Sequence, residues 1–408
     1  MNDIVTNAKL EPGGWFDAAK AMQADTIALR RAIHAEPELG LQTPKTLAKV
    51  RAALEGLPLE WKTGKSTTGA IAILRGAKPG RTVLLRGDMD ALPMPEDTGL
   101  PFRSNIEGTM HACGHDTHTA MLASAARILC ARRESLEGTV LFMFQPGEEG
   151  FHGARFMIDD GLLDNPAPDA AFALHIMPNA PAGTFGAKAG PMMASADKLI
   201  VKVIGKGGHA SMPHHAIDPI PVACEIVTAL QAFVTRRVDI FDPVVITVAK
   251  IDGGSTNNVI PEAANLLGTI RTLSEETRET AHAGIRRVCE HVAQAHECEA
   301  EVEIVQGFPV TVCDAKAVGV AERAVGSLFG AEAWQTMASP VMGAEDFSYV
   351  LNRVPGVMVF LGVCPEGQQW KMACPCHSNK MVLNEAMLAK GVAAHCAIAE
   401  SFLAKGFD

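Results

Sequence analysis

The feature that most constrains the fold is an alternation of short apolar runs with helix-like segments between residues 69 and 175. The apolar runs are GAIAIL at 69–74, TVLL at 82–85, GTVLFMF at 138–144 and DAAFAL at 169–174. Such runs, bounded by glycine, proline or charge, are typical of buried strands. Helical periodicity between them, at about 117–133 and 153–161, therefore predicts a mixed, mainly parallel α/β sheet.

A second pattern begins after Gly190, where residues 198–203 alternate polar and apolar side chains as a half-covered strand does. The expected elements that follow are a helix at about 218–236, strands near 244–251 and 264–272, a helix at about 274–297 and a strand at 300–305. This order is the split βαβ, ferredoxin-like α+β pattern. Because 408 residues exceed one ordinary core, we expect 193–308 to be an inserted domain and 1–192 with 309–408 to form the other.

Acidic and histidine side chains follow three of the expected strands. The run TVLL leads into Asp88 and Asp90, GTVLFMF leads into Glu148 and Glu149, and DAAFAL leads into His175. Ligands of open α/β sheets bind beyond the carboxyl ends of the strands, so these side chains should converge. The stretch MHACGHDTHTA at 110–120 adds Cys113 and His115, whose one-residue gap favours a loop over a helix.

One thiol, one carboxylate and three imidazoles are the donors that these segments and the downstream His377 supply. The predicted ligands are Cys113, His115, Glu149, His175 and His377. They suffice for two divalent metal ions that share a ligand, a centre able to polarise a carbonyl and activate water. The competing interpretations are a histidine-rich surface loop, a hydrogen-bonded core His175 and a solvated acidic turn.

Glu148 is expected to be the general base, since its neighbour Glu149 binds metal while Glu148 faces the water. Asp90 and Asp116 are candidates for carboxylates that orient the histidine ligands. Three residues of the inserted segment are candidates for substrate contacts: His209 in a glycine-rich turn for an oxyanion, and Asn258 and Arg271 for polar groups. Core or surface roles compete for each of these three.

Composition limits the partners and the compartment. A formal charge of −10 without a basic run argues against nucleic acid. No signal-like start and no apolar run of membrane length are present. Ten cysteines in a chain of 408 residues without a signal-like start are better explained as reduced thiols than as a disulfide framework. We therefore expect a cytoplasmic protein that acts on a small molecule, without a membrane or nucleic-acid partner.

A set of motifs occurs in order along nearly the whole chain from about residue 25. They are RGDMDALPM at 86–94, MHACGHDTHTA at 110–120, FQPGEEG at 144–150, the His175 strand, GKGGHAS at 205–211, NVIPEAA at 258–264, GTIRTL at 268–273, GAEDFS at 343–348 and HS at 377–378. The set resembles the amidohydrolase branch of the dinuclear metallopeptidases, which includes hippurate hydrolase, N-acyl-amino-acid amidohydrolases and auxin-conjugate hydrolases. The run Cys374-Pro375-Cys376 is not part of that resemblance.

The resemblance implies a phosphorylase/hydrolase-like catalytic domain and a smaller lid domain that forms a homodimer. It implies two zinc, manganese, cobalt or nickel ions on the five predicted ligands, Glu148 as base, and substrate contacts from His209, Asn258 and Arg271. The expected reaction is hydrolysis of an N-acyl amino acid, with an aroyl or aliphatic acyl group, to a carboxylic acid and an amino acid. Alternatives are a dipeptidase, an N-acetyl-diaminopimelate-type deacetylase, or a catalytically silent metal-binding protein.

Overall fold

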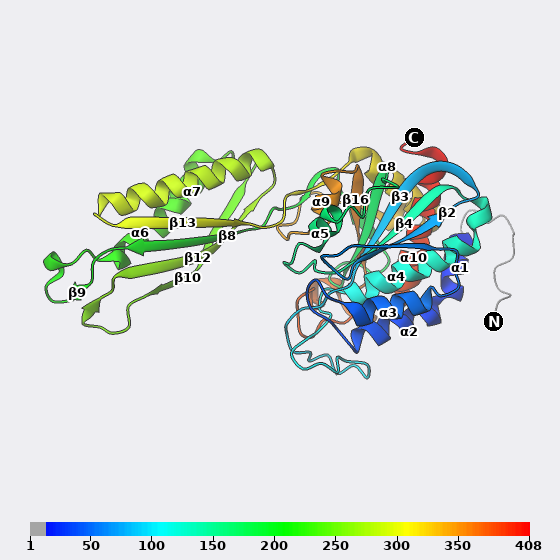
Figure 1. Ribbon diagram of the computed structural model, residues 1–408, viewed down its shortest axis with the longest axis horizontal. Helices are drawn as coiled ribbons and strands as arrows, with labels where there is room; N and C mark the ends of the chain where they lie inside the picture. Colours follow the sequence, from blue (N-terminus) through cyan, green and yellow to red (C-terminus); the bar gives the residue numbers. More distant parts are fainter. Residues whose placement is uncertain (1–13) are drawn as a thin grey trace. The chain divides into compact units, whose positions relative to one another are not determined.

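The computed structural model describes residues 14–408, which form two compact units (Figure 1). Unit 1 takes the chain as far as Gly190, then Val312–Ser339 and Tyr349–Asp408, and unit 2 takes Pro191–Thr311 and Pro340–Ser348. The insertion predicted from the sequence, 193–308, did not include the second segment of unit 2, Pro340–Ser348. Backbone bonds tie that segment to unit 2, since the Ala194 N–H donates to the Gly343 carbonyl oxygen at 2.9 Å.

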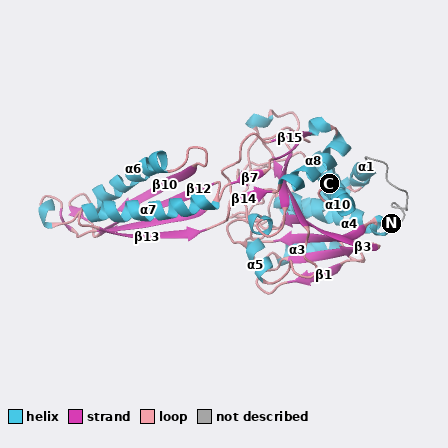
Figure 2. Ribbon diagram, turned by 90° about the horizontal axis from the view of Figure 1, so that it is seen from above, coloured by secondary structure: helices cyan, strands magenta, loops and turns pink. Residues whose placement is uncertain are grey.

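Unit 1 is built on a mixed eight-stranded sheet (Figures 1 and 2). In spatial order its strands are β1 (Glu60–Thr63), β2 (Ala70–Arg75), β4 (Glu137–Gln145), β3 (Lys78–Asp88), β5 (Ala170–Met177), β16 (Gly356–Gly362), β6 (Phe185–Ala187) and β15 (Trp334–Thr336). The four central strands, β4, β3, β5 and β16, are parallel to one another. Three of the four apolar runs thus form parallel strands as predicted, whereas the run at 69–74 forms the antiparallel β2. Antiparallel pairing is confined to the flanks, where β2 meets β1 and β4, and β16 meets β6.

Helices pack on this sheet and bury the apolar side chains of its strands. Outside unit 2 they are α1 (Gly14–Ala21), α2 (Gln23–His34), α3 (Pro44–Ala53), α4 (His115–Ala131), α5 (Gly153–Asp159), α8 (Ala315–Phe329), α9 (Ser348–Leu351) and α10 (Leu388–Lys405). Helices α4 and α10 pack on β3, and α8 packs on β16. The amphipathic pattern over residues 15–35 predicts one helix, and this prediction is wrong, because the chain breaks at Met22 into α1 and α2.

Helix α10 with the turn before it, Glu385–Lys405, is long and apolar enough to cross a membrane. Its apolar window is 72% buried inside the protein. The side chains of α10 pack against α4, α8 and the central strands. This helix is therefore explained by its position in the core of unit 1.

Unit 2 contains β8 (Asp197–Ile204), α6 (Pro219–Arg237), β10 (Val244–Gly253), β12 (Ala263–Thr272), α7 (Glu275–Ala295) and β13 (Glu299–Gln306). The strands pair antiparallel in the order β10-β12-β8-β13. The strand–helix–strand–strand–helix–strand order matches the predicted pattern. A small pair, β9 (Gly208–His209) and β11 (Val259–Ile260), extends from it, and the chain enters and leaves unit 2 at β7 (Gly190–Met193) and β14 (Thr311–Cys313).

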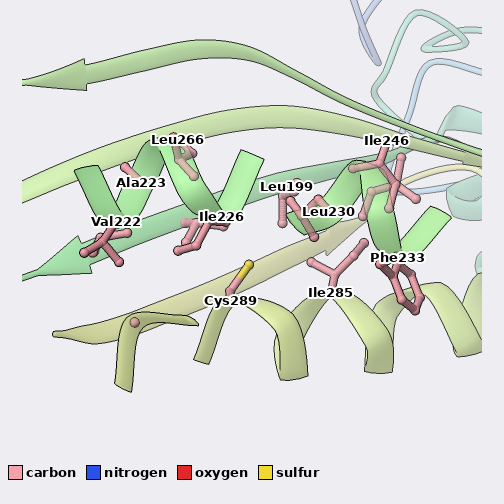
Figure 3. Packing of buried hydrophobic residues seen from close by; sticks show 14 of the residues in the cluster. Leu199, Val222, Ala223, Ile226, Leu230, Phe233, Ile246, Leu266, Ile285 and Cys289 are labelled. Carbon is pink, nitrogen blue, oxygen red and sulfur yellow. The ribbon is translucent and has the colours of Figure 1, made fainter. Parts of the chain in front are cut away.

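The core of unit 2 follows directly from the alternation that identified β8. Leu199, Val201 and Val203 are fully buried, whereas the residues between them are half-buried or exposed. Figure 3 shows Leu199 beside Ile226 and Leu230 of α6 and above α7. Burial of each aliphatic side chain of this kind stabilises the folded state by about 1.5–3 kcal/mol.

The first turn of α6 is capped by a side chain. The Asp218 carboxylate accepts a hydrogen bond from the Ile220 N–H, which has no partner within the helix.

The parallel strands of unit 1 deliver their carboxyl ends to one edge of the sheet. Asp88 at the end of β3 lies opposite Gln145 at the end of β4. His175 of β5 lies opposite Phe360 of β16. The loops that follow β3 and β4 and the start of α4 therefore meet at this edge.

Candidate metal centre

A sharp turn before α4 brings two predicted ligands together. Cys113 is in the loop, and His115 is the first residue of the helix. Gly114 between them has φ +86°, and a Cβ there would lie 2.5 Å from Ile176 Cγ1. Only glycine fits this conformation and this close approach. The turn lets the thiol and the imidazole reach a common point, which two positions of one helix at this spacing could not do.

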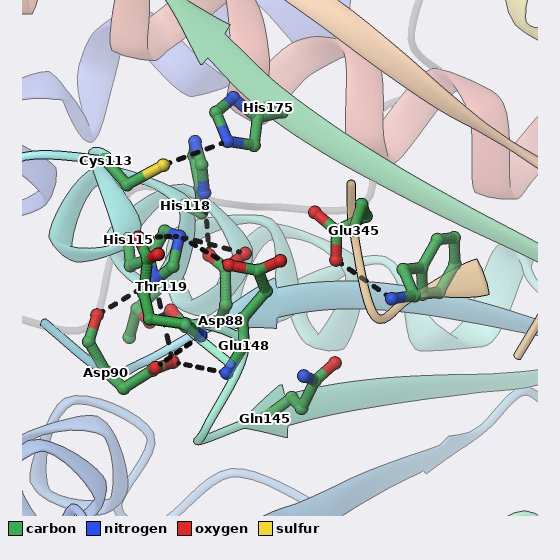
Figure 4. A network of polar contacts seen from close by, with 12 residues as sticks. Asp88, Asp90, Cys113, His115, His118, Thr119, Gln145, Glu148, His175 and Glu345 are labelled. Atoms are coloured by element: carbon green, nitrogen blue, oxygen red, sulfur yellow. Dashed lines mark hydrogen bonds and ion pairs between the residues drawn. The ribbon is translucent and has the colours of Figure 1, made fainter. Parts of the chain in front are cut away.

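The first group of potential metal donors is Cys113, His115 and His175, all buried, with ligand atoms within 4.8 Å of one another. The Cys113 Sγ and His175 Nε2 atoms are 3.4 Å apart (Figure 4). His175 was predicted to follow its strand but lies inside β5. Its Nδ1 donates to the Ile176 carbonyl oxygen at 2.7 Å, which leaves Nε2 facing the thiol.

A second group shares the same thiol: Cys113, Glu149 and His377. His377 Nε2 lies 3.3 Å from Glu149 Oε1. His377 has φ +66°, and its N–H donates to the Ala112 carbonyl oxygen at 2.8 Å, so backbone contacts hold it beside the loop of Cys113. All five predicted ligands thus belong to one constellation, with Cys113 common to both groups.

Two buried atoms of this constellation lack hydrogen-bond partners among residues 14–408. His115 donates from Nδ1 to the Asp90 carbonyl oxygen at 2.8 Å, and its Nε2 has no partner. Glu149 Oε1, 3.9 Å away, has no hydrogen bond either, and its contact with His377 Nε2 at 3.3 Å is an ion pair. Unsatisfied buried polar atoms are costly, and a cation between them would satisfy both. The thiol, carboxylate and imidazoles are also suitable zinc or transition-metal donors, so the residues fit a metal centre.

The electrostatics point the same way. Burial disfavours a charged His115, but Asp88, Asp90 and Glu149 outweigh it and raise the pKa of this imidazole well above its usual range. Burial would raise the pKa of Glu149, yet His377 and His115 lower it. A hydrogen bond with Cys376 and burial raise the pKa of the Cys113 thiol. The site is rich in carboxylates that favour positive charge.

Asp90 positions both glutamates of the loop after β4. Its two carboxylate oxygens accept the N–H groups of Glu148 and Glu149, each at 2.9 Å (Figure 4). Glu148 is buried, and its Oε2 lies 3.9 Å from His115 Nε2. The expected role of Asp90 thus takes a different form: its backbone carbonyl orients His115, and its carboxylate orients the loop.

Asp116 does not orient a candidate ligand, contrary to the prediction. It is fully buried and accepts from His34 Nδ1 at 2.8 Å, with Arg30 Nε at 2.7 Å. Burial opposes its charge, but Arg30 and His34 lower the pKa of this carboxyl strongly. Asp116 therefore joins α4 to α2 on the side of the helix away from His115.

Asp88 and His118 form a buried pair that the sequence reasoning left unassigned. His118 Nδ1 contacts Asp88 Oδ1 at 2.7 Å (Figure 4). Its Nε2 accepts the Ile176 N–H at 2.9 Å. Arg86 is ion-paired with Asp88. Both ring nitrogens of His118 are thus committed, which makes it a support for β5 and the loop. The i, i+3 spacing of His115 and His118 was the available signal.

The remaining predicted residues belong to unit 2. His209 and Asn258 are brought together, because β9 pairs with β11 and the Ala210 N–H donates to the Asn258 carbonyl oxygen at 3.1 Å. His209 Nδ1 accepts from Ser211 Oγ at 2.8 Å and from the Ser211 N–H. Arg271 is on β12, where burial lowers its pKa.

Comparison with known proteins assigns the chain to a group of hydrolases. The model of peptidase family M20/M25/M40 matches residues 84–401. Thermostable carboxypeptidase 1 of Saccharolobus solfataricus is 37% identical over 92% of this chain and 95% of its own. N-acetylcysteine deacetylase of Bacillus subtilis is 39% identical over 85% of this chain and 90% of its own.

A solved structure is also similar along its full length. The YXEP protein of Bacillus subtilis, described as a dinuclear metal binding peptidase of the M20 family, superposes with a TM-score of 0.81 at 34% identity. The alignment covers 94% of this chain and 99% of that one.

Proposed function

The chain belongs to peptidase family M20/M25/M40, a family of amide-bond hydrolases, and we propose that it hydrolyses N-acyl amino acids with two divalent metal ions. The ions would be held by Cys113, His115 and His175 and by Cys113, Glu149 and His377. When bound, they would polarise the amide carbonyl and make water easier to deprotonate. Zinc, manganese, cobalt and nickel all suit these donors.

The observation that carries this proposal is the position of Glu148 beside the donor set. Its carboxylate is 3.9 Å from His115 Nε2, which has no hydrogen bond of its own, and its backbone is fixed by Asp90. A carboxylate held there can take a proton from water and return it to the leaving nitrogen. A protein that only bound metal would have no use for this base, which argues against the catalytically silent alternative.

His209 is proposed as a donor to the substrate carbonyl oxygen. Because its Nδ1 accepts from Ser211, the ring proton of the neutral imidazole belongs on Nε2. That nitrogen is then available to donate to a developing oxyanion. Asn258 and Arg271 are retained as candidate contacts for polar groups of the substrate, and association of two chains through unit 2 and a cytoplasmic location as further expectations.

The acyl group is the finer part of the proposal. We expect aroyl or aliphatic groups to be preferred over acetyl. Met192 and Phe347, apolar residues in the loop segments 176–194 and 340–350, are fully buried and belong to the core. The similarity to a deacetylase supports an N-acyl substrate, whereas the similarity to a carboxypeptidase favours peptides as the second candidate.

The test is a substrate panel run on chelated protein and on protein reloaded with zinc, manganese or cobalt. The panel contains N-acetyl, N-benzoyl and long-chain N-acyl amino acids together with dipeptides. Metal-restored release of amino acid from the acylated compounds supports the proposal. Faster release from dipeptides than from every N-acyl compound would move the assignment to a peptidase, and faster turnover of N-acetyl than of N-benzoyl or long-chain compounds would overturn the acyl preference.

A further inference from the structure

The segment before His377 contains a cysteine that the metal centre does not use. Cys376 is partly exposed, and its Sγ lies 3.8 Å from the backbone carbonyl oxygens of both Cys113 and Ile176. The hydrogen bond from the His377 N–H to the Ala112 carbonyl oxygen aligns residues 376–377 with residues 112–113. Cys376 is therefore held against the loop that carries the thiol shared by both donor groups.

The two cysteines lie on neighbouring segments. The Cys376 Sγ atom is 3.8 Å from the backbone carbonyl oxygen of Cys113 itself, and both residues are free thiols in this structure. A disulfide requires Cα atoms only about 4.4–6.8 Å apart, and adjacent, hydrogen-bonded backbone segments bring residues this close. Cys113 is 8% exposed, so Cys376 is the more accessible member of the pair.

We propose that Cys113 and Cys376 are a reversible oxidation site, at which a disulfide removes the shared sulfur from the metal centre. A sulfur in a disulfide is no longer a thiolate and cannot serve as the anionic ligand of both groups. Metal binding and disulfide formation thus compete for Cys113. The inference concerns the metal centre and does not depend on which amide the protein hydrolyses.

A peroxide is the oxidant that balances the reaction. The Cys376 sulfur attacks one peroxide oxygen, the O–O bond breaks, and water leaves, which gives a sulfenic acid on Cys376. The Cys113 sulfur then displaces the hydroxyl from that sulfur as a second water. Two electrons pass from the pair of thiols to one peroxide, and two electrons from a thiol reductant reverse the reaction.

Peptide mapping tests the bond directly. Full-length protein is chelated, treated with hydrogen peroxide, blocked with an alkylating reagent and digested with trypsin without reductant. Cleavage at lysine and arginine places Cys113 in peptide 104–127 and Cys376 in peptide 372–380. We expect the two peptides to be cross-linked and to separate after reduction. No cross-link, or a bond between Cys374 and Cys376 within the second peptide, would overturn the proposal.

Metal content tests the consequence without any substrate. Peroxide-treated protein should rebind less zinc than untreated protein, and dithiothreitol should restore the difference. In Cys376→Ser, loss of zinc binding should be slower by about tenfold or more, because no second thiol forms the disulfide. Cys374→Ser is the matched control and should behave like the parent. An equal loss of zinc binding in Cys376→Ser and the parent would show that peroxide oxidises Cys113 directly, and it would exclude a disulfide between Cys113 and Cys376.

Discussion

His115 and Asp90 are linked by a hydrogen bond from the imidazole Nδ1 to the backbone carbonyl oxygen at 2.8 Å. The bond fixes the ring so that Nε2 faces the other candidate ligands. The carboxylate of the same aspartate holds the N–H groups of Glu148 and Glu149. One residue therefore orients a metal donor through its backbone and the predicted base through its side chain.

Asp90→Ala should separate these two functions. The backbone carbonyl remains, so His115 keeps its orientation, whereas the loop of Glu148 loses both anchors. We expect kcat/KM to fall by about 10- to 100-fold, with a smaller change in bound metal. Steady-state kinetics and metal analysis on the same samples check this. The exposed Asp97→Ala is the control, and equal activity in Asp90→Ala and the parent would exclude the positioning role.

Glu148→Gln should abolish turnover and leave metal content intact. The amide keeps the shape of the side chain but cannot accept the proton, which costs about 10²- to 10⁴-fold in kcat. Glu149→Gln is the matched comparison one residue away, and it should lose metal as well as activity. Metal content per chain, measured with activity, distinguishes them. Normal turnover in Glu148→Gln would remove this residue from the mechanism.

The two donor groups predict different metal stoichiometries. Cys113→Ala should reduce binding at both positions because it removes the shared sulfur. His175→Ala and His377→Ala should each weaken one position and leave the other. Titration with zinc or cobalt, with cobalt absorption reporting thiolate ligation, gives the number of ions per chain. His214→Ala, on a short turn in unit 2, is the control. Loss of both ions in all three ligand variants would mean that the positions are not separable.

Much of this constellation could be predicted because parallel strands end at a common edge. That rule placed Glu148, Glu149 and His175 together without knowledge of any contact. It could not decide which way the side chains of α4 point. Asp116 follows His115 by one residue, and one helical step of about 100° turns it toward Arg30 and His34.

Contacts between distant segments left no local signal either. Residues 340–348 join unit 2 through backbone bonds to residues 192–194, which no periodicity reveals. The break at Met22 contains neither glycine nor proline, so the apolar pattern of α1 and α2 continued through it. The pairing of Cys376 with Cys113 depends in the same way on a loop brought back across the sheet edge.

Gly284→Ala should destabilise unit 2 although it favours a helix. Alanine in a helix gains about 1 kcal/mol over glycine. A Cβ at Gly284 of α7, however, would lie 2.1 Å from Phe233 Cζ of α6, and overpacking of this kind costs about 1–3 kcal/mol. The matched control is Gly326→Ala in α8, where nothing lies within 4 Å of the added atom. Thermal unfolding should show a lower Tm for Gly284→Ala and an equal or higher Tm for Gly326→Ala. A higher Tm in both would show that α6 and α7 move apart freely.

Glu96 and His34 predict a pH dependence of stability in unit 1. His34 is fully buried, and its Nε2 contacts Glu96 Oε1 at 3.1 Å. Burial would raise the pKa of Glu96, but His34, the Ser104 N–H and Thr98 lower it to about 2 from 4.5. A lowered folded-state pKa gives stability that is present above the unfolded value and lost as pH falls from about 4.5 toward about 2.

Glu96→Gln should therefore lower the free energy of unfolding by about 1–3 kcal/mol at pH 7. The difference in the free energy of unfolding between Glu96→Gln and the parent should become smaller below pH 4.5. Urea unfolding of chelated protein between pH 7 and pH 3 measures it, with the exposed Glu107→Gln as control. A gap that stays constant over this range would mean that Glu96 acts through its shape and not through its charge.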